Sequence, residues 1–474
     1  MPNSTQLVVI GAGPGGYAAA FYAADRGMKV TLVDPEKNPG GVCVYRGCIP
    51  SKALLHVAGV INEAAHAGEF GVEFQKPTID LDKLRAFKNK VVGQLTSGAG
   101  QIRNLRKIQH LQGTAAFRDA RTLDVTLVDG SKDTLTFEHC IIATGSRPST
   151  IPGLSIDSPR LMDSTGALDL PDIPGSLLVV GGGYIGLELG TVYATLGTRV
   201  TVVEMTDGLL PGADRDLVSI LAKRIESICE AVWLNTKVKE AKEANGGKEI
   251  VVSFEGEGKS GEQAFDRVLV SVGRRPNSNV PGLERTRVQV DTRGFIAVDE
   301  SRRTGEPNIY AIGDVAGEPM LAHKASHEGR SAVDAIAGDR HVVFEPAAIP
   351  AVVFTDPEIA WAGLTETEAQ KQGRKVTIAK FPWGASGRAI TLGRTDGVTK
   401  LIIHPESGRV LGVGICGPGA GELIAEGVLA IEMGATAEDM AMTIHPHPTL
   451  SETVMESAEV FFGTATHVYR PRRQ

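Results

Sequence analysis

The 474-residue sequence predicts an α/β protein with two doubly wound domains, followed by a smaller α+β domain. Apolar strands at 7–10 and 177–180 each run directly into a glycine-rich loop and a helix-like segment. The two loops share one register, because 181 − 11, 186 − 16, 197 − 27 and 204 − 34 all equal 170. After about residue 345, short alternating runs such as 351–354 and 400–404 indicate an antiparallel sheet with flanking helices.

Composition and charge exclude several classes of protein. The net charge of −7 argues against a nucleic-acid binder, which would carry a basic surplus. Five cysteines are too few for a secreted disulfide framework, and no run of eighteen apolar residues predicts a membrane span. Because the first apolar strand begins at Leu7, we expect no targeting segment and a cytoplasmic location.

The first loop, Gly11-Ala12-Gly13-Pro14-Gly15-Gly16, has the spacing of a dinucleotide-binding turn. Gly11 makes the turn, Gly13 lets the backbone approach a diphosphate, and Gly16 lets helix and strand pack closely. The next strand ends at Asp34, which is placed to accept hydrogen bonds from an adenosine ribose. A purely structural turn is disfavoured, since strand, helix and acid all occur in register.

The second loop repeats these features with Gly181, Gly183 and Gly186, and its second strand ends at Glu204. A carboxylate there bonds the free 2′-hydroxyl of NAD and repels the 2′-phosphate of NADP, so NAD is favoured. One chain with two dinucleotide folds suggests electron transfer between two cofactors.

Two further carboxylates have alternative interpretations. Glu188 lies on the helix after the second loop, where a solvated helix face is the simplest interpretation. Asp314 ends an apolar strand at 309–312, where a side chain faces the cofactor crevice of a doubly wound sheet. A role as helix N-cap is also open to Asp314.

Cys43 and Cys48 lie five positions apart in a glycine-rich approach to a predicted helix. In a regular helix their Cα atoms would be about 8–9 Å apart, too far for a disulfide, so a bridge requires a bend that Gly47 permits. Pro50 suits the first turn of a helix, whose N-terminus would favour the Cys48 thiolate. The pair is either redox-active or two free buried thiols, and the nucleotide loops favour the former. The other cysteines, in apolar surroundings, are interpreted as small hydrophobes: Cys140, Cys229 and Cys416.

His447 is a candidate acid–base group in a proline-stiffened loop, with Glu452 five residues later. Histidine has an ordinary pKa that suits proton transfer near neutrality. A carboxylate on its far nitrogen would fix the tautomer and stabilise the imidazolium. For the neighbouring His445 we favour a structural role.

Taken together, these motifs resemble the flavin-dependent pyridine nucleotide–disulfide oxidoreductases over essentially the full length. Within that family the chain is most similar to the members that oxidise dihydrolipoamide with NAD. The resemblance depends on residues 11–16, 43–52, 143–148, 181–204, 313–314 and 445–452.

The resemblance implies FAD in the first site, with Asp34 on its ribose and Asp314 on its ribitol chain, and NAD in the second. It implies Cys43 as the interchange thiol and Cys48 as the thiolate against the flavin. Lys52 would lie by the reactive flavin nitrogen, paired with Glu188. The cofactor-binding residues expected are Gly11, Gly13, Gly16, Asp34, Lys52, Thr144, Gly145, Gly181, Gly183, Gly186, Glu204, Gly273, Asp314 and Ala322.

It also implies a homodimer in which His447, oriented by Glu452, serves the partner's thiols. The substrate would be dihydrolipoamide on the lipoyl domain of an acyltransferase (E2) in a 2-oxo acid dehydrogenase complex. We expect an FAD domain at 1–148 and 275–345, an NAD domain at 149–274 and a dimerisation domain at 346–474.

Val42, Tyr45 and Arg46 depart from the usual family pattern around the thiols, and Arg46 is expected to favour thiolate. The rival functions are a related NAD(P)H-dependent disulfide or mercuric reductase and a non-catalytic docking scaffold. A mercuric reductase is expected to carry a C-terminal cysteine pair, whereas this chain ends Arg470-Pro471-Arg472-Arg473-Gln474. A scaffold has no need of both thiols together with His447 and Glu452.

Overall fold

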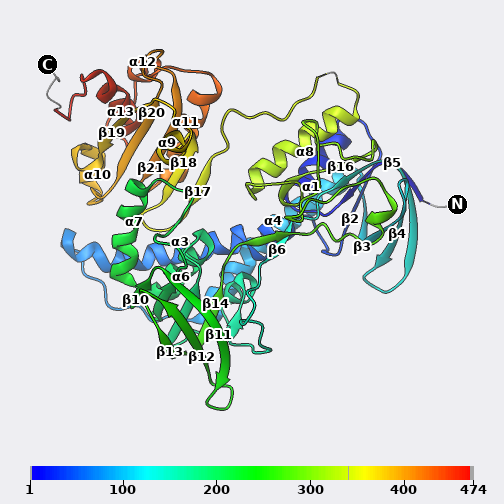
Figure 1. Ribbon diagram of the computed structural model, residues 1–474, viewed down its shortest axis with the longest axis horizontal. Helices are drawn as coiled ribbons and strands as arrows, with labels where there is room; N and C mark the ends of the chain where they lie inside the picture. Colours follow the sequence, from blue (N-terminus) through cyan, green and yellow to red (C-terminus); the bar gives the residue numbers. More distant parts are fainter. Residues whose placement is uncertain (1–2, 340, 470–474) are drawn as a thin grey trace.

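The computed structural model describes residues 3–339 and 341–469, so the C-terminal Arg470–Gln474 lies outside the described residues. The protein has three lobes, and each is built around one main sheet. In Figure 1 the N-terminal lobe is at the right, the middle lobe is below and the C-terminal lobe is at upper left. This mixed α/β architecture confirms the predicted fold class. The domain limits 1–148 with 275–345, 149–274 and 346–474 remain our proposal.

The N-terminal sheet contains five parallel strands, and a meander extends it. The parallel strands, in spatial order, are β3 (Gln109–Asp119), β2 (Val30–Asp34), β1 (Asn3–Ile10), β5 (Lys132–Ile142) and β16 (Ile309–Ala311). The far halves of β3 and β5 pair antiparallel with β4 (Thr122–Leu127). Helices α1 (Pro14–Asp25) and α8 (Ala322–Ile336) pack against each other.

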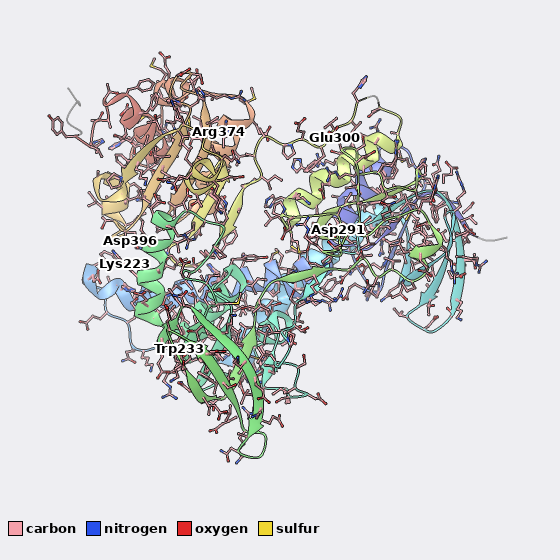
Figure 2. All side chains as sticks on the ribbon, viewed as in Figure 1. Lys223, Trp233, Asp291, Glu300, Arg374 and Asp396 are labelled. Carbon is pink, nitrogen blue, oxygen red and sulfur yellow. The ribbon has the colours of Figure 1, made fainter. Side chains whose placement is uncertain are left out.

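The middle sheet repeats this plan. Its parallel strands, in spatial order, are β10 (Ala231–Trp233), β9 (Arg199–Val203), β8 (Ser176–Val180), β14 (Arg267–Val270) and β7 (Leu161–Met162). A separate antiparallel meander follows, with β11 (Thr236–Ala244), β12 (Glu249–Gly256) and β13 (Gly261–Phe265). Trp233, labelled in Figure 2, joins the two by packing edge-on against Phe254, with ring centroids 5.1 Å apart. The helices are α6 (Tyr184–Leu196) and α7 (Arg215–Ile228).

The C-terminal sheet is wholly antiparallel, as the runs at 351–354 and 400–404 predicted. Its strands, in order, are β17 (Ala351–Val353), β18 (Ile359–Gly363), β21 (Val410–Cys416), β20 (Val398–Ile403) and β19 (Thr377–Pro382). Helices α11 (Ala420–Glu432) and α13 (Glu452–Phe462) cover it.

The thiol segment is more helical than the sequence indicated. Cys43 lies within a short helix, α2 (Gly41–Arg46), and Cys48 begins α3 (Cys48–His66). Gly47 separates the two helices and provides the expected bend. A Cβ at Gly47 would lie 2.8 Å from the Val42 carbonyl oxygen, so the turn is tight.

The remaining elements are shorter or connect the lobes. They are α4 (Leu81–Leu105), α5 (Ser164–Leu168), α9 (Glu366–Lys371), α10 (Gly387–Thr391), α12 (Ala437–Met442), β6 (Ser146–Pro148), β15 (Arg274–Pro276) and the 3-10 turns η1 (Ala67–Phe70), η2 (Leu283–Arg285), η3 (Gly313–Val315) and η4 (Trp383–Ala385). Across residues 3–339 and 341–469, no helix has both the length and the apolar character needed to cross a membrane.

A buried ammonium group joins the middle and C-terminal lobes. Lys400 of β20 is fully buried, and its Nζ lies 2.7 Å from Asp214 Oδ2 and 2.8 Å from Asp216 Oδ1. Glu366 of α9 completes the cluster at 3.3 Å. These three carboxylates are close enough together to bind a cation, and the Lys400 ammonium supplies the positive charge.

Candidate active site

Asp34 binds the first glycine loop from the end of β2. Its Oδ2 accepts a hydrogen bond from the Ala12 backbone N–H at 2.7 Å, and its Oδ1 accepts one from the Glu36 N–H at 2.9 Å. Asp34 is 8% exposed, and burial raises its pKa despite these bonds. The carboxylate therefore fixes the loop from the edge of the sheet where a ribose would lie.

Glu204 makes the same pair of contacts in the second site. Its Oε2 accepts from the Gly182 N–H at 2.7 Å and its Oε1 from the Thr206 N–H at 2.8 Å. These donors are again offset by 170 residues from those of Asp34. The internal repeat thus extends from the glycine pattern to individual hydrogen bonds.

Close backbone packing explains why glycine is needed late in both loops. A Cβ at Gly16 would lie 1.9 Å from the Gly11 carbonyl oxygen, and one at Gly186 would lie 2.3 Å from that of Gly181. No real side chain tolerates such contacts, so helix and strand meet as closely as a dinucleotide loop requires. A Cβ at Gly183, by contrast, would meet nothing within 4 Å.

A cavity of about 520 Å³, a size typical of cofactor sites, is lined mainly by the N-terminal lobe and also by α5 and α6 of the middle lobe. Of the predicted site residues, its lining includes Gly11, Gly13, Asp34, Cys43, Cys48, Lys52, Thr144, Gly145, Glu188, Asp314 and Ala322. The predicted residues that do not line it are Gly16, Gly181, Gly183, Gly186, Glu204, Gly273, His447 and Glu452. The cavity therefore joins the thiols to the ribose end of the first site.

Cys43 and Cys48 are free thiols, hydrogen-bonded to each other. The bond from Cys43 is the largest cause that lowers the pKa of Cys48, to about 7, and Lys52 lowers it further against the effect of burial. The same bond and burial raise the pKa of Cys43. The pair therefore favours a Cys48 thiolate beside a protonated Cys43.

Glu188 is 3% exposed, so the interpretation as a solvated helix face is wrong. Its Oε2 accepts from Lys52 Nζ at 2.7 Å and from Ser51 Oγ at 2.9 Å. Its Oε1 accepts from the Phe354 N–H at 3.0 Å. Lys52 Nζ also lies 4.4 Å from the centroid of the Phe354 ring. Three segments, namely α3, α6 and the residue after β17, thus fix one ammonium group beside the cavity.

Asp314 is held by residues that the sequence analysis did not identify. Ser146 Oγ donates to Asp314 Oδ2 at 2.5 Å, and Arg274 Nε donates to Ser146 Oγ at 2.7 Å. Arg274 and Tyr184 both line the cavity. Tyr184 directly follows Gly183 of the second loop, so the two nucleotide sites border each other.

Arg46 does not act on the thiols as expected. Its Nη2 donates to Glu36 Oε1, and the cation that lowers the pKa of Cys48 is Lys52. The C-terminal residue of α2 thus faces the ribose end of the cavity, because Glu36 follows Asp34 closely. The position of Arg46 between Cys43 and Cys48 in the sequence did not reveal that its side chain turns toward Glu36.

His447 and Glu452 form a pair at the start of α13. His447 Nδ1 lies 2.9 Å from Glu452 Oε1, and Glu452 Oε2 accepts from the Thr449 N–H at 2.8 Å. Burial opposes ionisation, but these two bonds keep the pKa of Glu452 lowered. The His447 side chain is 72% exposed, whereas that of His445 is 5% exposed and contacts Glu426 at 2.7 Å.

This arrangement suits two-electron exchange between a dithiol and a bound nucleotide. It combines two doubly wound lobes, a cavity that reaches a thiol pair, and a histidine–carboxylate pair on a third lobe. The fold and the site thus define a nucleotide-dependent disulfide oxidoreductase.

Comparison with known proteins agrees with this class. Residues 5–329 match the pyridine nucleotide-disulphide oxidoreductase family, and residues 349–458 match the dimerisation domain of the same family. The chain belongs to this family. Family membership implies a flavin and a nicotinamide cofactor, and the dimerisation domain supports a homodimer.

Individual relatives and solved structures resemble the chain over nearly its full length. A dihydrolipoyl dehydrogenase of Haemophilus influenzae is 49% identical over 98% of this chain and 96% of its own. One from Geobacillus stearothermophilus is 47% identical over 98% and 97%. Among solved structures, LpdA from Mycobacterium tuberculosis has a TM-score of 0.89 at 27% identity, covering 96% of this chain and 99% of its own. A Cu(II) complex of the HOCl-induced flavoprotein disulfide reductase RclA from Escherichia coli has a TM-score of 0.85 at 27% identity, covering 97% and 99%.

Proposed function

We propose that the chain oxidises protein-bound dihydrolipoamide to lipoamide and reduces NAD, using Cys43 and Cys48 as its redox disulfide. The observation that carries the proposal is the thiol pair on a cavity that continues to Asp34, beside the buried Lys52–Glu188 pair. The dihydrolipoyl dehydrogenase relatives, with 43–49% identity over nearly the whole chain, support the same activity.

FAD fits the first site on several observations. The carboxylates of Asp34 and Asp314 border the cavity, and Gly13 and Gly145 leave its wall without side chains. When bound, FAD would accept an electron pair from the dithiol and pass it as a hydride to NAD. The Lys52 ammonium would lie beside the flavin ring and favour negative charge there.

The protein's own residues carry the disulfide exchange. His447 accepts a proton from one substrate thiol, and the resulting thiolate attacks Cys43 Sγ of the Cys43–Cys48 disulfide. That bond breaks, and Cys48 leaves as a thiolate, which Lys52 stabilises. The second substrate thiol then attacks the mixed disulfide, lipoamide leaves, and Cys43 becomes a thiol. Two electrons have passed from substrate to protein.

Glu204 supports NAD as the second cofactor. Its carboxylate closes the second loop through the Gly182 and Thr206 amides, at the position where a 2′-phosphate would meet negative charge. The lipoyl domain of an E2 acyltransferase is the proposed substrate carrier. A partner-subunit His447 would complete each site, and the cytoplasmic location stays a prediction.

An anaerobic turnover assay tests the proposal directly. The full-length protein is mixed with dihydrolipoamide and NAD, and separately with oxidised glutathione and NADPH. We expect NADH formation only in the first mixture, and its loss in Cys43→Ser. Turnover with the second pair alone would assign the chain to the rival disulfide reductases instead.

A further inference from the structure

The Arg46 guanidinium lies on the wall of the first cofactor cavity, at its acidic end. Arg46 and Glu36 both line this cavity and form an ion pair. Glu36 also donates its backbone N–H to the Asp34 carboxylate at 2.9 Å. The pair therefore stands beside the carboxylate that would meet the adenosine ribose.

Two acidic groups crowd this end of the cavity. Burial is the largest cause that raises the pKa of Asp34, and the negative charge of Glu36 raises it further. The two N–H bonds that Asp34 accepts from Ala12 and Glu36 lower that pKa, and the positive charge of Arg46 lowers it further. Without Arg46, Asp34 would lose a positive charge that offsets Glu36, and a protonated Asp34 would accept fewer hydrogen bonds.

Arg46 also has a donor to spare. Its side chain is 41% exposed and lines the cavity, and within residues 3–339 and 341–469 it donates only through Nη2, to Glu36. The other N–H groups of this guanidinium can therefore donate to a ligand bound in the cavity. A guanidinium suits an anionic dinucleotide particularly well.

We propose that Arg46 is a positioning residue for the adenosine half of the flavin dinucleotide, because it neutralises Glu36 beside Asp34 and keeps one N–H for the anionic ligand. This inference rests on the proposed function, which puts FAD in the first site. It also gives a role to Arg46, which departs from the usual family pattern and pairs with Glu36.

Flavin release from the full-length holoprotein tests the inference. The variants are Arg46→Met, Arg46→Lys, Glu36→Gln and the double variant Arg46→Met/Glu36→Gln. Each is diluted at pH 8 and at pH 6, and the rise in flavin fluorescence gives the dissociation constant. We expect Arg46→Met to weaken binding roughly tenfold or more, as for a lost charge-assisted hydrogen bond. The loss should be larger at pH 6, where Asp34 gains protons more readily.

The double variant separates electrostatics from folding. Removing both charges should restore much of the affinity lost in Arg46→Met, and Arg46→Lys should lose less than Arg46→Met. Unchanged affinity in Arg46→Met, or a double variant as weak as Arg46→Met, would overturn the inference. If Arg46→Met does not fold, flavin affinity of the Glu36→Gln variant tests the inference instead. Loss of flavin from Glu36→Gln would contradict the inference.

A second measurement distinguishes this role from an effect on the thiols. The thiolate absorbance of Cys48 in the reduced protein should titrate at the same pH in Arg46→Met and wild type. A shifted midpoint of the Cys48 titration with unchanged flavin affinity would mean that Arg46 acts on the thiols. That result would overturn the inference. Wild-type protein that binds no flavin would instead refute the proposed function.

Discussion

His447, in contact with Glu452, is proposed to accept the proton in the dithiol half-reaction only. His447→Gln removes the proton acceptor but keeps the size of the side chain. We expect oxidation of dihydrolipoamide to fall about 10²–10⁴-fold, the usual contribution of general acid–base catalysis. Reduction of the flavin by NADH should stay near wild type. Stopped-flow absorbance of each half-reaction measures both, and equal survival of the two would disprove the assignment.

The Cys48 thiol should titrate near neutrality in the reduced protein. Its pKa is lowered to about 7, chiefly by the hydrogen bond from Cys43 and then by Lys52. The thiolate is therefore expected above that pH and is lost below it. Absorbance of the thiolate near 240 nm follows the titration. Cys43→Ala and Lys52→Met should each raise the midpoint, and a midpoint that neither variant moves would contradict the geometry.

At the scale of the residue, proximity was predictable where partners lie close together in the sequence, and the roles of these residues remain a prediction. Cys43, Cys48 and the five-residue step from His447 to Glu452 are all visible in the chain, and the structure brings each pair into contact. Glu188 was open to misinterpretation because its partners come from separate segments. Lys52 precedes it by 136 residues and Phe354 follows it by 166. No local sequence pattern could predict that these distant residues contact Glu188.

At the scale of the element, we expect a substitution in one glycine loop to abolish the function of that loop's nucleotide site and not of the other. Gly16→Ala drives a methyl group into the Gly11 carbonyl, whereas Gly186→Ala does the same at Gly181. We expect Gly16→Ala to lose flavin, measured by absorbance at 450 nm. Gly186→Ala should keep its flavin but lose reduction by NADH. Gly59→Ala is the matched control, because it has open space in α3 and should stabilise by about 0.8–1 kcal/mol. Flavin loss in both loop variants alike would argue against two separate sites.

The parallel strands and the repeat were predictable, since buried strands and glycine loops leave a strong periodic signal. Helix α2 was not, because six residues with two glycines at the approach, Gly40 and Gly41, look like a loop. Its formation depends on tertiary contact: a Cβ at Gly41 would lie 2.4 Å from the Gly13 Cα. The first loop thus packs directly against the start of the helix that carries Cys43.

The Lys400 cluster is one of several contacts between the middle and C-terminal lobes. Burial opposes ionisation of both aspartates, but hydrogen bonds lower their pKa values, chiefly from Lys400 to Asp214 and from Lys380 and Lys400 to Asp216. Lys400→Met leaves the buried Asp214 carboxylate without its cation, although Lys380 still pairs with Asp216, so we expect a loss of about 3–5 kcal/mol in the free energy of unfolding. Urea denaturation at pH 7 measures the loss.

The pH dependence checks the cause. A lowered pKa gives stability that is present above the unfolded value, about 3.9 for Asp, and lost as pH falls through the folded value. The difference between Lys400→Met and wild type should therefore shrink below about pH 4. Lys83→Met is the control, because its pair with Asp80 is exposed and worth at most about 1 kcal/mol. A constant difference across pH would point to packing alone.

At the scale of the whole molecule, the histidine and the thiols of one chain do not share a cavity. His447 is absent from the lining around Cys43, and its side chain is 72% exposed. Beside it, Ile444 is 95% exposed and Met442 is 77% exposed. Such apolar exposure on a dimerisation domain is expected of a surface that a second copy covers.

Mixed dimers decide whether the active site is shared across that surface. Homodimers of His447→Gln and of Cys43→Ser should each be inactive with dihydrolipoamide and NAD. When the two variants are co-expressed, each mixed dimer joins an intact Cys43 from one subunit to an intact His447 from the other, and its second site has neither. Random pairing makes half the dimers mixed, so we expect about a quarter of wild-type activity, because two-fold symmetry provides two equivalent sites. If both groups acted within one chain, no mixture could recover activity, and the shared site would be refuted.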